Sequence, residues 1–203
     1  MKKKLLCIQS HYGKPPKLFQ KAKKRDDTIV IRQSQLSSRD ITDATALITT
    51  MHLDQIGMME FSKELEVFLE RGGRWFFNGH MMRPLVYDLK NYIYIDEGGD
   101  RESLRLTELS DHFVFKDISR DAFLERKGVA GFYGRGHNPM PKGAVAITGV
   151  GRKKAPIDWV CKFGTEGEFF SHSGNDIWGA IGKGEMQNRL LENIITWVTK
   201  EES

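Results

Sequence analysis

The fold is decided by residues 44–84, which read ATALITT (44–50), LDQIGMMEFSKELEVFLERGG (53–73) and RWFFNGHMMRP (74–84). The first piece and the start of the third have the near-continuous apolar residues of strands buried on both faces. Between them, an Asp54 N-cap and a Gly72-Gly73 stop delimit a predicted helix. The apolar stripe of this helix, at spacings near three and four, comprises Ile56, Met59, Phe61, Leu65, Phe68 and Leu69. Strand, helix and strand in this order predict a right-handed unit of a parallel sheet.

Further strands are predicted on both sides of this unit, at residues 4–9, 28–32, 92–95 and 112–115. From residue 128 to residue 170, strand-like runs (VAGFY, AVAITG, IDWVCKF and EFF) alternate with Gly-rich turns, which favours antiparallel additions to the sheet. Residues 186–198 have the pattern of a closing amphipathic helix. The sequence therefore predicts an α/β fold with a mostly parallel central sheet and antiparallel additions in its C-terminal half.

Length and composition are those of an ordinary globular protein. The 203 residues are most economically one domain (1–203), with 39% apolar and 29% charged residues. No apolar run approaches the roughly 18 residues of a membrane span, and LLCIQS after the initial lysines is too short for a signal peptide. We therefore expect a cytoplasmic protein without membrane contact. Cys7 and Cys161 lie in apolar runs and are expected to be buried in strands.

The candidate site is the turn Asn78-Gly79-His80 at the end of the second buried strand. In parallel sheets, ligands bind where strands end and loops lead into helices. His80 there could act as a general base, a metal ligand or a hydrogen-bond donor, or could simply be packed in a tight turn. Asn78 and Gly79 would serve the turn itself, through unusual backbone angles or close approach of a ligand. Arg83 suits a carboxylate or phosphate in the same cleft, or is a surface residue. His11, after the first strand, is a further ligand-binding candidate.

A second polar turn, SHSGND (171–176), carries His172, Asn175 and Asp176. Together with His80, His172 and Asp176 could act as acid and base, or bind a divalent metal. The alternative is a Gly-containing turn in which Asp176 caps the segment that follows. Nothing in the sequence indicates a cofactor, and a metal is only an option.

The chain resembles the class I glutamine amidotransferase-like superfamily, and within it the ThuA-like (trehalose-utilisation-like) branch. The resemblance rests on the helix ending at Gly72-Gly73, RWFFNGH (74–80), HFVF (112–115) before Asp117-Ile118, GRGHNPMPKGAVAITG (134–149), EFFSHSGNDIW (168–178) and NIITW (193–197) in the last helix. These motifs follow the family's order from about residue 44 onward. The resemblance implies a flavodoxin-like three-layer sandwich.

The departures from the family's pattern bear on activity. His80 stands where amidotransferases carry their cysteine nucleophile, and His172-Ser173-Gly174 has glycine where the family's histidine is followed by glutamate. A thiolate needs an adjacent base and an orienting group, so we expect no glutaminase activity. The resemblance instead implies a pocket at His80 for a small polar ligand, a sugar or phosphometabolite, with hydrolysis or isomerisation conceivable.

A non-catalytic binding or assembly module is the alternative. Its contact surface would be a basic segment that could attract nucleic acid or an acidic partner, or could be a solvated helix face: Lys14, Lys17, Lys21, Lys23, Lys24 and Arg25. A homodimer is also compatible with the sequence.

Overall fold

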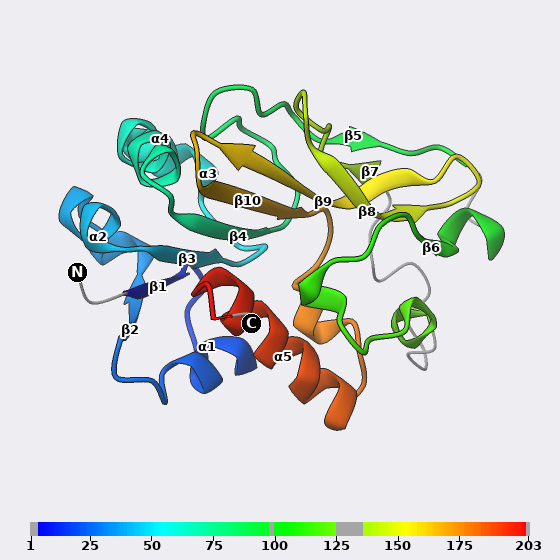
Figure 1. Cartoon of the computed structure of the whole chain (residues 1–203), viewed down its shortest axis with the longest axis horizontal. Helices are drawn as coiled ribbons and strands as arrows, with labels where there is room; N and C mark the ends of the chain where they lie inside the picture. The colour runs from blue at the N-terminus through cyan, green and yellow to red at the C-terminus, as the bar shows by residue number, and fades with distance from the viewer. Residues whose placement is uncertain (1–3, 98–99, 125–135, 202–203) are drawn as a thin grey trace.

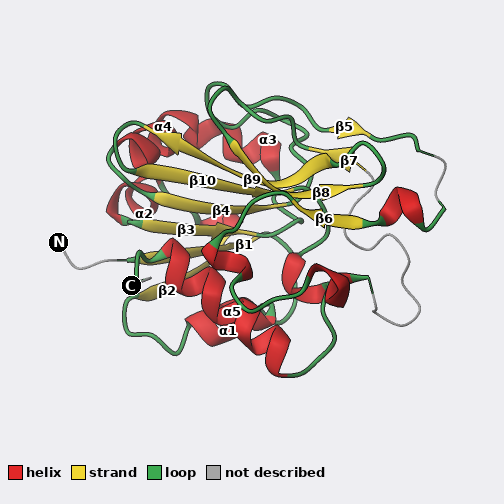
Figure 2. Ribbon diagram, turned by 45° about the vertical axis from the view of Figure 1, so that its right-hand side comes forward, coloured by secondary structure: helices red, strands yellow, loops and turns green. Residues whose placement is uncertain are grey.

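The computed structural model describes residues 4–97, 100–124 and 136–201. Within these residues the main sheet has eight strands in the order β2-β1-β3-β4-β10-β9-β8-β6 (Figures 1 and 2). The bounds are β1 Leu5–Gln9, β2 Thr28–Arg32, β3 Ala46–Thr49, β4 Arg74–Asn78, β6 Leu106–Glu108, β8 Val145–Val150, β9 Ala155–Phe163 and β10 Gly167–His172. A separate two-stranded sheet pairs β5 (Ile93–Tyr94) with β7 (Gly136–His137).

The main sheet is parallel in one half and antiparallel in the other. The neighbours β2, β1, β3, β4 and β10 run parallel. The pairs β10–β9, β9–β8 and β8–β6 are antiparallel. This arrangement confirms the predicted fold class, including the antiparallel additions in the C-terminal half.

Helices cover both faces of the sheet and complete three layers (Figure 1). On one face, α1 (Lys17–Ala22) and α5 (Glu185–Val198) contribute to one apolar cluster with inward side chains such as Phe76 and Phe170. On the other face, α2 (Ser38–Asp43), α3 (Gln55–Met58) and α4 (Ser62–Glu70) pack over a second cluster around Trp75 and Phe169. Burial of both faces explains why the central strands have near-continuous apolar sequences.

The helix predicted between β3 and β4 is divided into three pieces. After α3, a 3₁₀ turn covers Met59–Phe61 before α4 begins at Ser62. A 3₁₀ turn has 3.0 residues per turn rather than 3.6, so it shifts the apolar stripe around the helix axis. Ile56 and Met59 are consequently 68% and 45% exposed, and their predicted place in the buried stripe is wrong. Leu65, Phe68 and Leu69 of α4 are fully buried, as predicted.

The strand predicted at residues 112–115 is also wrong. Phe113–Phe115 forms a 3₁₀ turn, in which His112 Nδ1 accepts a hydrogen bond from the Val114 backbone N–H at 3.3 Å. This local cap gives the backbone an alternative to pairing with a strand. The predicted VAGFY strand (129–133) lies outside the described residues.

Two other expectations concern burial and membranes. Cys7 in β1 and Cys161 in β9 are buried, as predicted. In the ranges 4–97, 100–124 and 136–201, every helix is too short or too polar to cross a bilayer.

Candidate functional site

The turns after β3, β4 and β10 meet at one edge of the sheet. β4 and β10 are paired so that Asn78 lies beside His172, and the Gly79 N–H donates to the His172 carbonyl at 2.9 Å. Because parallel strands end at the same edge, residues far apart in sequence are brought together there. The candidate residues predicted after these strands are therefore neighbours in space, whatever direction their side chains take.

Gly79 allows the turn to lie against the loop after β3. Its φ is +121°, and a Cβ at this position would lie 3.0 Å from Cα of Met51. Both the positive φ and the close approach require glycine. The neighbour that approaches Gly79 is thus the protein's own backbone.

Asn138, which was not among the predicted site residues, fixes the turn from the opposite side. Its Nδ2 donates to the Gly79 carbonyl at 3.0 Å and to Ser171 Oγ at 2.9 Å, while its Oδ1 accepts from the Met81 N–H at 2.8 Å. The residue is 1% exposed. Its side-chain partners lie 33 or more residues away in sequence, so no local pattern marks it as a site residue.

Gln55, at the start of α3, holds the residues that follow Gly79. Its Nε2 donates to the His80 carbonyl at 2.6 Å, and its Oε1 accepts from the N–H groups of Met82 and Arg83 at 2.8 and 2.9 Å. The backbone around His80 is therefore set by side chains from α3 and from the Asn138 loop.

The His80 side chain is half-buried at a cleft of about 440 Å³. Its ring centroid lies 4.1 Å from that of Tyr92, and Nε2 is buried with no hydrogen-bond partner among the described residues. Burial, assisted by the charge of His172, lowers the pKa of His80. A neutral imidazole that can donate or accept a hydrogen bond is thus placed at the cleft. The cleft is lined by Met51, Leu53, Asp54, Gln55, Ile56, His80, Met82, Arg83 and Gly174.

Arg83 lies at the same cleft and is exposed. Its Nη1 donates to the Met82 carbonyl at 2.8 Å. The structure therefore brings Arg83 and His80 together, as one of the two sequence interpretations expects.

His172 does not share the cleft with His80. Its ring is 1% exposed, with Nδ1 2.7 Å from Asp158 Oδ1 and Nε2 2.8 Å from the Asn175 carbonyl oxygen. A carbonyl only accepts, so Nε2 carries a hydrogen, and Nδ1 shares one with the fully buried Asp158 carboxylate. Both ring nitrogens are used within the protein, so this arrangement favours a role in positioning the β10 turn over direct contact with a ligand.

Asp176 connects the β10 turn to the loop after β3. Its Oδ1 accepts from the Met51 N–H at 2.8 Å, and it makes no side-chain cap on the following turn, Ile177–Gly179. The predicted local cap is therefore wrong, because a donor from another strand end takes its place. Burial raises the pKa of Asp176 to about 6, against the lowering effect of the Met51 N–H and of nearby histidines.

Other polar atoms at this edge are buried without a hydrogen-bond partner in the part of the chain that the structure describes. Besides His80 Nε2, they are His11 Nδ1, Thr50 Oγ1 and Asn78 Nδ2. The rings of His11 and His52 lie 5.3 Å apart. Among the described residues, no three His, Cys, Asp or Glu side chains are grouped so as to hold a metal ion. Four polar atoms at this edge are thus left without a hydrogen bond inside the described part of the chain.

The basic segment near the N-terminus is largely occupied within the fold. Lys14, Lys23 and Lys24 are exposed and have no ion-pair partner among the described residues. The other three side chains are held by residues of α5 or of neighbouring loops: Lys17 by Gln187, Lys21 by Glu192, and Arg25 by Asp27 and Glu201.

Fold and site together describe an α/β sandwich with a polar cleft at the carboxyl edge of its parallel strands. No family model matches the chain, and no curated protein matches it. A solved structure of Gan42B, a GH42 beta-galactosidase, superposes with a TM-score of 0.47 at 12% sequence identity. The alignment covers 99% of this chain and 30% of that chain, so this chain spans less than a third of its length. A likeness at this level assigns no activity.

Proposed function

We propose that this chain is a ThuA-like protein that binds a small polar ligand, a sugar or phosphometabolite, in the cleft beside His80. The observation that carries the proposal is that His80 lines a cleft of about 440 Å³ while its buried Nε2 has no partner among the described residues. A buried polar atom without a hydrogen bond is costly. A ligand hydroxyl or phosphate oxygen would satisfy it.

The other groups at the cleft favour the same ligand class. Arg83 supplies a guanidinium suited to phosphate. The neutral ring of His80 can accept a proton from a hydroxyl group, which makes it the candidate general base if the pocket is catalytic. Asp176, whose pKa burial raises to about 6, accepts a hydrogen bond from the N–H of the cleft residue Met51 and so supports the wall of the cleft.

Cysteine chemistry is disfavoured by the positions of both thiols. Cys7 and Cys161 are buried in strands rather than placed in a turn, and burial raises the pKa of each. A nucleophilic cysteine needs the opposite shift. The proposal therefore excludes the glutaminase reaction of the superfamily.

Binding of nucleic acid or an acidic partner through residues 14–25 stays a prediction. Half of its six basic side chains are held by partners within the fold. The three remaining lysines provide a weaker electrostatic surface than the sequence suggests. We therefore place the ligand in the cleft.

The test is a thermal-shift and calorimetric screen with glucose and glucose 6-phosphate as the initial probes. The proposal expects a probe that stabilises the protein, with binding lost in His80→Ala. Arg83→Ala should weaken the phosphorylated probe more than the neutral one. The control is the triple variant Lys14→Ala/Lys23→Ala/Lys24→Ala, which should bind normally. Undiminished binding in His80→Ala, or loss of binding in the triple variant, would contradict the proposal.

A further inference from the structure

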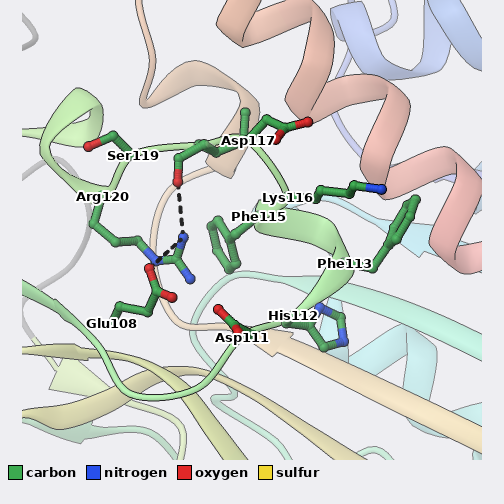
Figure 3. A pocket seen from close by; sticks show the side chains of 10 residues that line it. Glu108, Asp111, His112, Phe113, Phe115, Lys116, Asp117, Ser119 and Arg120 are labelled. Atoms are coloured by element: carbon green, nitrogen blue, oxygen red, sulfur yellow. Dashed lines mark hydrogen bonds and ion pairs between the residues drawn. The ribbon is translucent and has the colours of Figure 1, made fainter.

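A second and larger cavity, of about 710 Å³, lies away from the His80 cleft. Its wall is formed by residues of the segment 108–120, which begins at the last residue of β6 and packs against α5. Figure 3 shows the Arg120 side chain pointing into this cavity, with its guanidinium between Glu108 and Phe115. The cavity thus has one buried cationic group placed within it, and Lys116, the other basic residue of the wall, is exposed.

Arg120 is buried yet only partly hydrogen-bonded. The residue is 7% exposed, its Nε donates to Thr148 Oγ1 at 3.0 Å, and its Nη1 donates to the Ile118 carbonyl at 3.3 Å. A guanidinium has five N–H groups. The other three have no hydrogen-bond acceptor among the described residues. A planar group with free donors on Nη1 and Nη2 matches a carboxylate in bidentate geometry.

The protein fixes the orientation of this guanidinium, but the carboxylate beside it lies beyond hydrogen-bonding distance. Its carbon lies 3.7 Å from the centroid of the Phe115 ring, which fixes the plane. The nearest carboxylate, Glu108, is 4.0 Å from Nη1, too far for a hydrogen bond, and its side chain is 51% exposed. Glu108 can therefore move aside for a ligand.

The rest of the wall limits how much negative charge the cavity accepts. His112 contributes none, because burial lowers its pKa to about 4 and leaves the ring neutral. Asp111 is exposed on the rim, and Asp117 lies 4.0 Å from Arg189 of α5. Phe113, Phe115 and Ile118 add apolar surface. Lys116 is exposed, with its Nζ 5.8 Å from the centroid of the Phe113 ring, so Arg120 is the buried cation of the wall. One buried cation, acidic neighbours and aromatic walls suit a ligand with a single carboxylate and an apolar body.

We propose that the 108–120 cavity binds a small monocarboxylate with an apolar body, whose carboxylate pairs with Arg120 and displaces Glu108. This site is independent of the His80 cleft. The proposal does not depend on the function assigned to that cleft, and substitutions at either site should leave the other unaffected.

The test uses three probes with the same ring and different charge: phenylacetate, neutral 2-phenylethanol and dianionic phenylmalonate. Titrations followed by amide chemical shifts should show phenylacetate binding at residues 108–120, about tenfold or more tighter than 2-phenylethanol because of the charged hydrogen bonds. Phenylmalonate should bind more weakly than phenylacetate. Equal binding of the neutral probe, tighter binding of the dianion, or no binding of phenylacetate would each overturn the proposal.

Two variants test the residues. Arg120→Lys keeps the charge but loses the bidentate geometry, and should weaken phenylacetate about tenfold, whereas Arg39→Lys, on an 86% exposed side chain, should have no effect. Glu108→Gln removes the competing carboxylate and should tighten binding about threefold. If Arg120→Lys fails to fold, Glu108→Gln decides: unchanged or weaker binding in that variant refutes displacement of Glu108.

Discussion

Two histidines follow neighbouring strands at the same edge of the sheet, and they differ in what their ring nitrogens contact. His172, the last residue of β10, is 1% exposed and has Asp158 and the Asn175 carbonyl as partners. His80, two residues past the end of β4, has a buried Nε2 without a partner in the described residues and lies at a cleft. The same residue type at adjacent strand ends thus has two different environments.

The difference follows from which strands flank each turn. β10 is paired with β9 on one side, and this antiparallel neighbour places Asp158 directly beside His172. β4 lies between two parallel strands, β3 and β10, whose loops leave a cleft beyond the strand ends. At the junction of the parallel and antiparallel halves, a residue of β9 therefore holds the His172 side chain. Between two parallel strands, the His80 side chain instead lies at the cleft. Four predictions test this contrast, beginning with the largest expected effect.

The largest effect is expected from breaking the His172–Asp158 pair. His172→Ala should lower the free energy of unfolding by about 3–5 kcal/mol, because it leaves a buried carboxylate without its partner. Asp158→Ala should cost a similar amount, and the double variant should cost less than the sum of the two. Urea denaturation measures all three, with exposed His52→Ala as the control. Losses below about 1 kcal/mol would show that His172 is not the structural member of the two.

The next effect concerns the pH dependence contributed by Asp176. Its pKa of about 6 in the folded protein exceeds the ordinary value of 3.8, so between these values the native state keeps a proton that the unfolded chain has lost. Stability from this group is therefore present at low pH and falls as pH rises from about 4 to about 6, by up to about 3 kcal/mol. Asp176→Asn keeps an acceptor for the Met51 N–H and removes this loss. Denaturation at several pH values should show that the free energy of unfolding of the variant, relative to that of the wild type, increases as the pH rises across that window. A constant difference would mean that the carboxyl is not buried as described.

Much of the fold could be predicted because its signals are local. β2 has the predicted bounds, β1 begins one residue later than predicted, and β3 and β4 lie within the predicted stretches 44–50 and 74–84, since strands buried on both faces have continuous apolar sequences. The predicted helix after β3 is present but interrupted by a 3₁₀ turn, which places Ile56 and Met59 outside the buried stripe, and the predicted strand at 112–115 is wrong because a 3₁₀ turn forms there. Capping by His112 and the 3₁₀ turn at Met59–Phe61 depend on local geometry that hydrophobic periodicity does not record.

The position of the candidate site could be predicted from the sequence, but the residues that belong to it could not. The sequence offered His80 and the SHSGND turn as parts of one site only on condition that the two turns meet, and the structure places the turns side by side. Neither Asn138 nor Asp158 carried a signal, because each acts through partners on other strands. Without them, His172 could not be recognised as a histidine whose hydrogen bonds are already made within the protein.

A smaller effect is expected from Gly79→Ala, which strains the turn that carries His80. The backbone has φ +121° and a Cβ would lie 3.0 Å from Cα of Met51, so we expect a loss of about 2 kcal/mol of stability together with weaker ligand binding. Gly143→Ala is a matched control, since Gly143 has φ +84° with nothing within 4 Å of an added Cβ. It should cost stability through strain alone and leave binding unchanged. If both variants lost ligand binding equally, the geometry of the Gly79 turn would not be what shapes the cleft.

The smallest effect on stability is expected from His80→Ala, and this smallness is what distinguishes His80 from His172. The substitution removes a ring contact with Tyr92, but it also removes a buried Nε2 that lacks a partner among the described residues. These contributions oppose each other, so the free energy of unfolding should change by less than about 1 kcal/mol. The Gly79 and Asn138 bonds that shape the turn use backbone and Asn138 atoms, so they survive the substitution. A folded His80→Ala protein of near-normal stability that no longer binds the cleft ligand would place His80 in recognition. A loss as large as that of His172→Ala would instead make both histidines structural, because a ring that only contacts a ligand has little to contribute to the stability of the free protein.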